Sequence, residues 1–320
     1  MVKHRTKIYI AGHKGMVGSA CWRLLEKSGY SNIIGRTSKE LDLRNQNDVY
    51  KFINNEKPDV IICAAAKVGG ILANSKYPYQ FLLDNMQIQN NLICAAHECN
   101  ISKFIFLGSS CIYPKLAPQP LKEECLLTNS LESTNEWYAI AKISGVKLCQ
   151  AVRKQYNKEF LSLMPTNLYG PFDNFGLKTS HVIPAMIRKF YEAKENGDSD
   201  VNLWGTGNAI REFLHVDDLA NAIVFALENK LPEHLYNVGS GVEITIKELA
   251  KLIQSIIGHD GRINWDYTKP DGTPRKLMDS SKIIKLGWQP NYNLKTGIEK
   301  TYAWFLKNQA YLKKIKFEID

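Results

Sequence analysis

Tyr138 and Lys142 are the two side chains whose types and spacing most directly indicate acid–base chemistry. They lie four residues apart, so on a helix both project from one face, one turn from each other. A phenol alone has a pKa of about 10, but a neighbouring ammonium favours the phenolate and brings proton transfer closer to neutral pH. Ser133 and Glu136 are predicted to form a capping box that starts this helix. An ordinary surface helix can carry the same Tyr–Lys pair, so the pair indicates catalysis only if other functional motifs lie beside it.

A glycine-rich turn near the start of the chain predicts a dinucleotide site. Residues 7–11 are a short apolar, β-branched run, followed by Gly12, Gly15 and Gly18 and then by an amphipathic segment, 20–27. This order predicts a strand, a glycine turn and a helix. The glycines let the backbone approach a pyrophosphate, and the helix N-terminus supplies the positive end of its dipole.

Basic residues follow the second predicted strand, 32–35, at the place where an NAD-preferring protein carries an acid for the ribose 2′-hydroxyl. Arg36 and Lys39 stand there instead, and Lys14 lies in the glycine turn. Positive charge at this point suits a 2′-phosphate, so the sequence favours NADP over NAD. A surface turn with stray lysines is the alternative.

Strands and helices alternate through the first half of the chain. Further strands are predicted at 59–66, 103–107 and 160–164, the first of them buried on both faces because its apolar run is continuous. Ser109 and Cys111 follow strand 103–107, at the carboxyl edge where open α/β sheets bind ligands. The sequence therefore predicts an α/β fold with a doubly wound, Rossmann-type parallel sheet.

The alternation loosens after about residue 172, which indicates a second part. We predict an NADP-binding domain over 1–171 and a smaller, mainly substrate-binding α/β domain over 172–320, with segment 210–240 able to return to the first domain. A helix is expected over 41–54, where Asp42 either reaches the adenine side or caps the helix. Later strands are predicted at 201–204, 235–238 and 263–267, and later helices at 181–195, 216–229, 245–257 and 294–308.

Composition limits the class of protein. The 320 residues are 44% hydrophobic and 23% charged, as in an ordinary globular protein of roughly two domains. No apolar run approaches the ~20 residues of a membrane span, and the apolar stretch after the basic start is too short for a signal peptide, so we expect a cytoplasmic protein. The net charge of +9 suits anionic small molecules or simply a lysine-rich surface, and no nucleic-acid motif appears. The seven cysteines show no metal-ligand spacing, so we expect thiols and no metal site.

Together these motifs resemble the extended short-chain dehydrogenase/reductase family, and most closely its members that epimerise and reduce GDP-4-keto-6-deoxy sugars with NADPH. The resemblance covers essentially the whole chain. It rests on residues 11–19 (AGHKGMVGS), 64–71 (AAAKVGGI), 108–115 (GSSCIYPK), 164–171 (MPTNLYGP), 180–185 (SHVIPA), 211–218 (REFLHVDD) and 269–276 (KPDGTPRK). Two positions depart from it: Lys14 stands where an arginine is expected, and Ser38 where the residue is often basic.

For catalysis, the resemblance implies that Tyr138 gives a proton to the C4 ketone oxygen during reduction. Lys142 is implied to lower the pKa of that phenol and to hold the nicotinamide ribose, and Ser109 to hydrogen-bond the substrate oxygen. C3 and C5 flank the ketone, so inverting them needs a base and an acid on opposite faces of the ring. The resemblance puts Cys111 and His181 in these roles. Without it, the first would be predicted to be a small buried hydrophobe and the second a structural histidine.

The resemblance also implies two sets of binding residues. NADP(H) is expected to contact Gly12, Lys14, Gly15, Met16, Val17, Gly18, Arg36, Asp42, Lys142, Pro165, Asn167, Leu168 and His181. The nucleotide sugar is expected to contact Lys189, Trp204, Arg211 and Asp271. An arginine can grip a phosphate bidentately, and a tryptophan gives a flat face beside a polar ligand. His215, in the same motif as Arg211, is predicted to be structural.

Two alternatives remain. A sister enzyme would act on another GDP-4-keto sugar, such as a heptose or a 3,6-dideoxyhexose; a reductase-only sister would need neither Cys111 nor His181, and both are present. A non-catalytic NADP-sensing or scaffold protein on the same fold would have no need for Ser109, Tyr138 and Lys142, and all three are present.

A homodimer is a further expectation from the resemblance. It would be built on the helices predicted at 81–98 and 135–155, whose apolar faces exceed what packing on one side of a sheet needs. These faces include Phe81, Leu82, Ile88, Leu92, Val146 and Leu148.

Overall fold

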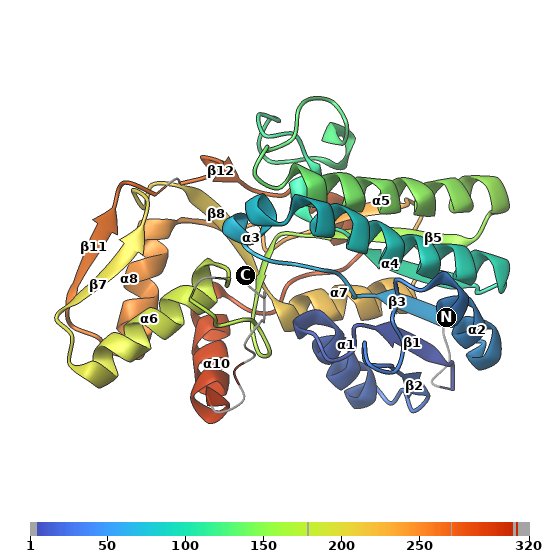
Figure 1. The fold of residues 1–320 in the computed structure, drawn as a ribbon, viewed down its shortest axis with the longest axis horizontal. Helices are drawn as coiled ribbons and strands as arrows, with labels where there is room; N and C mark the ends of the chain where they lie inside the picture. Colours follow the sequence, from blue (N-terminus) through green and yellow to red (C-terminus); the bar gives the residue numbers. More distant parts are fainter. Residues whose placement is uncertain (1–4, 178, 270, 310–311, 313–320) are drawn as a thin grey trace.

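A six-stranded parallel sheet forms the centre of the computed structural model, which describes residues 5–177, 179–269, 271–309 and 312. Its strand order is β2-β1-β3-β4-β5-β9, and every neighbouring pair is parallel (Figure 1). The strands are β1 (Ile8–Ala11), β2 (Ile33–Ile34), β3 (Val60–Cys63), β4 (Lys103–Leu107), β5 (Glu159–Pro165) and β9 (Leu235–Val238). This arrangement confirms the predicted doubly wound α/β fold.

Helices cover both faces of this sheet, which explains why its strands are mostly apolar and buried (Figure 1). On one face lie α1 (Met16–Lys27) and α7 (Val216–Glu228), which share one buried cluster with the strands. On the other lie α2 (Gln46–Glu56), α4 (Pro78–Glu98) and α5 (Glu136–Tyr156), which share a second cluster. Both α7 and β9 come from the second half of the chain, so that half returns to the main sheet.

The remaining second-half elements form a smaller α/β part beside the main sheet (Figure 1). Its core joins α6 (Val182–Asn196), α8 (Ile246–Ile257) and α10 (Leu294–Lys307). Two strands, β7 (Asp200–Trp204) and β11 (Arg262–Asp266), pair in parallel against these helices.

A small mixed sheet connects the two parts. Its order is β10-β8-β12, and β6, which follows β5 of the main sheet directly, also pairs with β8. These strands are β6 (Asn167–Tyr169), β8 (Ile210–His215), β10 (Glu243–Thr245) and β12 (Arg275–Lys276). Short helices complete the fold: α3 (Ile71–Lys76), α9 (Ser281–Lys285), and the 3₁₀ turns η1 (Ser110–Ile112) and η2 (Glu123–Cys125).

One predicted helix cap and one predicted helix start are wrong. Helix α5 begins after Asn135, where no described side chain caps it, and Ser133 is exposed, so the capping box expected with Glu136 is not formed. Helix α2 begins at Gln46 rather than at residue 41, because the side chain of Asn45 accepts a hydrogen bond from the next turn and fixes the start there.

No described helix is long and apolar enough to cross a membrane. All seven cysteines are free, and four of them, Cys21, Cys63, Cys111 and Cys149, are buried. Cys111 is the buried thiol that follows β4, at the edge where the predicted site lies.

Candidate active site

The glycine turn after β1 has the shape that a pyrophosphate needs. Gly12 has a φ of +83°, and a Cβ there would lie 2.8 Å from the backbone nitrogen of Ala65, in the loop after β3. A side chain would therefore fill the crevice where the strand order switches between β1 and β3. Gly15 is the N-cap of α1, no described side chain caps this helix, and its first turn has no acidic residue. The positive end of the helix dipole therefore faces the turn, and these residues fit a dinucleotide.

Arg36 lies just after β2, beside the glycine turn, but it already has partners. Its guanidinium donates to the carboxylate of Glu56 at 2.8 Å and lies 5.2 Å from the centre of the Phe52 ring. The ring of His13, from the glycine turn, lies so close to Gly35 that a Cβ there would clash with it. A 2′-phosphate at this place would have to share Arg36 with Glu56.

The other predicted cofactor residues are placed as follows. Asp42 accepts hydrogen bonds from the backbone and guanidinium of Arg44, so it makes a local turn instead of capping α2. Asn167 donates to the carbonyl of Glu212 at 2.8 Å. The side chains of Met16, Val17 and Leu168 pack partly buried against the core under α1 and α7, and Pro165 ends β5.

Four of the five predicted catalytic side chains lie together, where β4 ends beside α5. Ser109 caps η1: its Oγ accepts from the N–H of Cys111 at 3.4 Å. The Nζ of Lys142 donates to the carbonyl of Leu107 at 2.9 Å and lies 5.7 Å from the centre of the Tyr138 ring. The charges of Cys111 and Lys142 influence one another's ionisation, as do those of Cys111 and Tyr138. A thiol, two hydroxyls and an ammonium thus converge on one edge of the sheet.

The expected lowering of the Tyr138 pKa by Lys142 is wrong for this arrangement. Burial raises the pKa of Tyr138, and the negative charge of a Cys111 thiolate raises it further. The ammonium of Lys142 points to the end of β4 instead of the phenol, and burial lowers its own pKa. Tyr138 is therefore a protonated phenol at neutral pH, which suits a proton donor.

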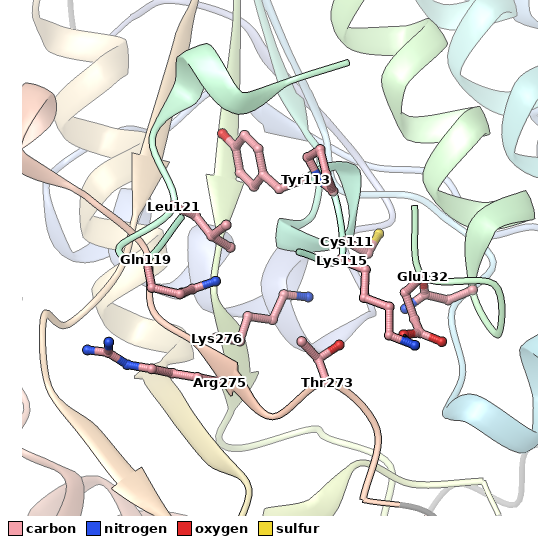
Figure 2. Close-up of a pocket in the computed structure, with 11 residues that line it drawn as sticks. Cys111, Tyr113, Lys115, Gln119, Leu121, Glu132, Thr273, Arg275 and Lys276 are labelled. Carbon is pink, nitrogen blue, oxygen red and sulfur yellow. Dashed lines mark ion pairs between the residues drawn. The ribbon is translucent and has the colours of Figure 1, made fainter. Parts of the chain in front are cut away.

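Cys111 opens into a small polar pocket (Figure 2). Burial raises the pKa of its thiol, and the charges of Lys276 and Lys142, with the hydrogen bond to Ser109, oppose that effect. The pocket is also lined by Lys115, Gln119, Glu132, Asn135 and Thr273. Sequence reasoning assigned no role to Lys276, although this residue ends the motif 269–276. In the structure it pairs in register with Arg211.

His181 is not in hydrogen-bonding contact with this cluster. It is the N-cap residue of α6 and exposed, and its side chain makes no hydrogen bond or ion pair with any described residue. The surrounding chain still lowers the pKa of its imidazole, because desolvation disfavours the charged ring. The loop before it touches the loop after β3, where the N–H of Gly70 donates to the carbonyl of Thr179 at 3.4 Å. His181 is thus available to a ligand that enters between these loops.

The four predicted nucleotide-sugar residues lie in the smaller part, in two linked pairs. Lys189 lies 5.8 Å from the centre of the Trp204 ring, which is 49% exposed and so open to a ligand. Arg211 donates to the backbone carbonyl of Asp271 at 3.1 Å. The carboxylate of Asp271 accepts from the N–H and hydroxyl of Thr206, two residues beyond the tryptophan, and so joins the pairs. Lys269 also lies 5.8 Å from the centre of the Trp204 ring, and an exposed aromatic face with two cations beside it suits a base linked to phosphates.

His215 is structural, as predicted. It is almost fully buried, and its Nδ1 accepts from the N–H of Asp217 at 3.2 Å, which caps α7. Burial lowers the pKa of this imidazole to about 4, so it stays neutral.

Comparisons with known proteins show which family this chain is similar to. The model of the NAD dependent epimerase/dehydratase family matches residues 8–239. GDP-L-fucose synthase 1 of Arabidopsis thaliana is 57% identical over 302 residues, which are 94% of each chain. GDP-L-fucose synthase of Escherichia coli (strain K12) is 50% identical over 315 residues, 95% of this chain and 98% of that one.

Two solved structures are also similar. A GDP-6-OMe-4-keto-L-xylo-heptose reductase from C. jejuni is 36% identical, with a TM-score of 0.90 and coverage of 96% of this chain and 99% of that one. A GDP-L-fucose synthetase from Naegleria fowleri bound to NADP is 27% identical, with a TM-score of 0.89 and 98% coverage of both chains.

Proposed function

Because the chain belongs to the NAD dependent epimerase/dehydratase family, and within it to the GDP-L-fucose synthases, we propose that it converts GDP-4-keto-6-deoxy-D-mannose to GDP-L-fucose with NADPH. One observation carries this proposal at the site itself: the Cys111 thiol lies beside Ser109, Tyr138 and Lys142. A base for carbon-bound protons and an acid for the ketone oxygen therefore share one edge of the sheet.

Reduction uses the groups at the end of β4. When bound, NADPH supplies the hydride for C4. Tyr138, which is protonated at neutral pH, delivers its phenol proton to the oxygen of the ketone. Ser109 hydrogen-bonds the same oxygen and fixes its position. Lys142, held through its ammonium on the carbonyl of Leu107, is placed to hold the nicotinamide ribose.

Epimerisation precedes reduction, since only the ketone acidifies C3 and C5. The thiolate of Cys111 takes the proton from carbon and becomes a thiol, while the electron pair of the C–H bond moves into the enolate. Tyr138 and Ser109 stabilise the enolate oxygen by hydrogen bonding. His181 gives a proton to the carbon from the opposite face of the ring and regains a proton from solvent. Cys111 releases to solvent the proton that it took and is again a thiolate.

The nucleotide part of the substrate binds in the smaller part of the fold. Arg211, whose guanidinium is charged at neutral pH, contacts the diphosphate, and Lys189 contributes a second cation. The exposed face of Trp204 lies beside the base or its ribose. Asp271 holds Arg211 through its backbone and is fixed by Thr206.

The sister activity on a heptose is the second candidate, because the heptose reductase from C. jejuni has nearly the same fold. Its identity of 36% is below the 57% of the plant GDP-L-fucose synthase. Cys111 and His181, which a reductase alone would not need, also favour the epimerase-reductase.

The test is incubation with GDP-4-keto-6-deoxy-D-mannose and NADPH, with the product identified by NMR. We expect GDP-L-fucose. A product with the original configuration at C3 and C5, or turnover only of a GDP-heptose derivative, would contradict the proposal.

A homodimer through α4 and α5 belongs to the same proposal, although part of the sequence argument for it is wrong. Phe81, Leu92 and Val146 are fully buried within the protomer, because the two helices pack on each other and on the sheet. The outward apolar residues on α5 are instead Trp137 and Ile140, which are 40% and 41% exposed.

A further inference from the structure

The proposed function, on which this inference rests, needs Cys111 as a thiolate, yet burial favours the neutral thiol. The groups next to Cys111 stabilise its thiolate only in part. Ser109 hydrogen-bonds the sulfur, and the negative charge of the thiolate and the phenol of Tyr138 disfavour each other's ionisation. The ammonium of Lys142 is held by the carbonyl of Leu107. A further positive charge facing the sulfur would stabilise the thiolate where these groups do not.

Lys276 reaches the sulfur from the opposite side of the pocket. Strand β12 pairs in parallel with β8, and this pairing places Lys276 in register with Arg211. Successive side chains of a strand point to opposite sides. Arg275 also lines the pocket, but its guanidinium is held in a bidentate pair with Glu243 at 2.9 and 3.0 Å, whereas the ammonium of Lys276 stays in the pocket with Cys111. Figure 2 shows the two side chains of β12 diverging in this way.

The backbone around Lys276 is fixed to the loop that follows Cys111. The N–H of Leu277 donates to the Oε1 of Gln119 at 2.9 Å, and its carbonyl accepts from Leu121 at 2.8 Å. The N–H of Met278 donates to the buried carboxylate of Glu212 at 3.0 Å. Because these bonds join the backbone on both sides of the pocket, the strand that carries Lys276 is held against the loop that follows Cys111.

The charge of Lys276 has no carboxylate partner in the part of the chain that the structure describes. No described residue forms a hydrogen bond or ion pair with its ammonium, and the acid of the pocket, Glu132, is paired with Lys115 at 2.8 Å. Arg211 is a second cation nearby and repels it. The Cys111 thiolate is the anion that most raises the pKa of Lys276, and Lys276 is the group that most opposes the effect of burial on Cys111.

We propose that Lys276 is a positioning residue for epimerisation: its ammonium, held by β12 opposite Cys111, keeps this cysteine as the thiolate that takes protons from C3 and C5. Lys276 touches no reacting atom in this role and acts through the sulfur.

The first test is a titration of Cys111 in the substrate-free protein. The ultraviolet absorbance of the thiolate is followed against pH, and the same titration of a Cys111→Ser partner is subtracted, so that the other cysteines cancel. Lys276→Met should raise the apparent pKa of Cys111 by about one unit, because a facing opposite charge shifts the pKa of a group by about one to three units. Lys276→Arg, which keeps the charge, should restore most of the shift. Arg275→Met, which removes the neighbouring charge that is paired with Glu243, is the matched control and should leave the titration unchanged.

The second test measures exchange of C3 and C5 protons with solvent. Below the pKa of the thiol, Lys276→Met should slow exchange about ten-fold with little change in KM, and the loss should shrink as pH rises, because more of the thiol then ionises on its own. If Lys276→Met leaves the Cys111 titration unchanged, the proposal is overturned. If the same variant also has a raised KM, Lys276 is a ligand of the substrate diphosphate instead. The two tests can also separate. If Lys276→Met shifts the Cys111 titration but the wild type exchanges no C3 or C5 protons of this sugar, the Lys276–Cys111 pairing is supported and the proposed function is contradicted.

Discussion

The phenol of Tyr138 keeps its proton because burial and the nearby sulfur both disfavour the phenolate. The phenol is therefore in the protonated form that a proton donor needs at neutral pH, and its raised pKa makes it a weaker acid than a free phenol. The ammonium of Lys142, turned to the carbonyl of Leu107, does not oppose this effect of burial.

Replacing Tyr138 by phenylalanine removes the proton donor and leaves the ring packed near Phe81, 6.4 Å away between centres. We expect kcat for reduction to fall roughly 10²–10⁴-fold with the fold intact, the usual value of a positioned acid. Tyr156→Phe, which loses a hydroxyl from the exposed end of the same helix, should keep full activity. A Tyr138→Phe protein that retains more than about a tenth of wild-type kcat would show that another group protonates the oxygen.

We propose that the β2–α2 unit is the element that selects the cofactor. It places Arg36 beside the glycine turn and holds the guanidinium on Glu56 and over Phe52. The ion pair between Arg36 and Glu56 is partly exposed to solvent, so it contributes little free energy. Exchanging the Glu56 carboxylate for the 2′-phosphate of the cofactor therefore costs little. The unit therefore favours NADPH by less than an unpaired arginine would.

NADPH should still be preferred to NADH. Arg36→Ala should reduce the ratio of the kcat/KM value for NADPH to that for NADH by up to roughly ten-fold. A charged hydrogen bond is worth about 1.5–3 kcal/mol, and the loss of the ion pair with Glu56 on binding the phosphate reduces that gain. Glu56→Gln should widen the ratio, because the guanidinium then has no competing carboxylate. Equal kcat/KM values in the wild type, or a wider ratio in Arg36→Ala, would refute this assignment.

Across the molecule, local pattern predicted the main sheet well because its strands are continuous apolar runs between clear turn signals. Strand 103–107 was placed to the residue for that reason. The start of α2 was misplaced because a single side chain, Asn45, fixes it against the apolar pattern. Lys276 was overlooked because it sits on a two-residue strand that only long-range pairing with β8 brings to the site. Local pattern thus places the long elements, but it does not show which residues long-range strand pairing brings to the site.

The outward face of α5 should carry the subunit contact. We expect light scattering at micromolar concentration to give about twice the chain mass of 36.3 kDa. Ile140→Glu should reduce this to the monomer mass, because a buried, unpaired carboxylate at an interface is costly. Tyr50→Glu, at an equally exposed position on α2, should leave the dimer intact. A wild-type protein that shows only a 36.3 kDa species would rule the dimer out.

The measurement that bears most directly on the proposed chemistry is turnover in D₂O with NADPH, with deuterium at C3 and C5 read by NMR for the wild type and for Cys111→Ser. A hydroxyl keeps the shape of the thiol but is far less acidic, so the variant should lose exchange at both carbons while slowly reducing the unepimerised ketone through Tyr138. The wild type should carry deuterium at C3 and C5 of a sugar with the L-configuration. If Cys111→Ser incorporates deuterium at both carbons at the wild-type rate, the thiol is structural and the account of this site is wrong.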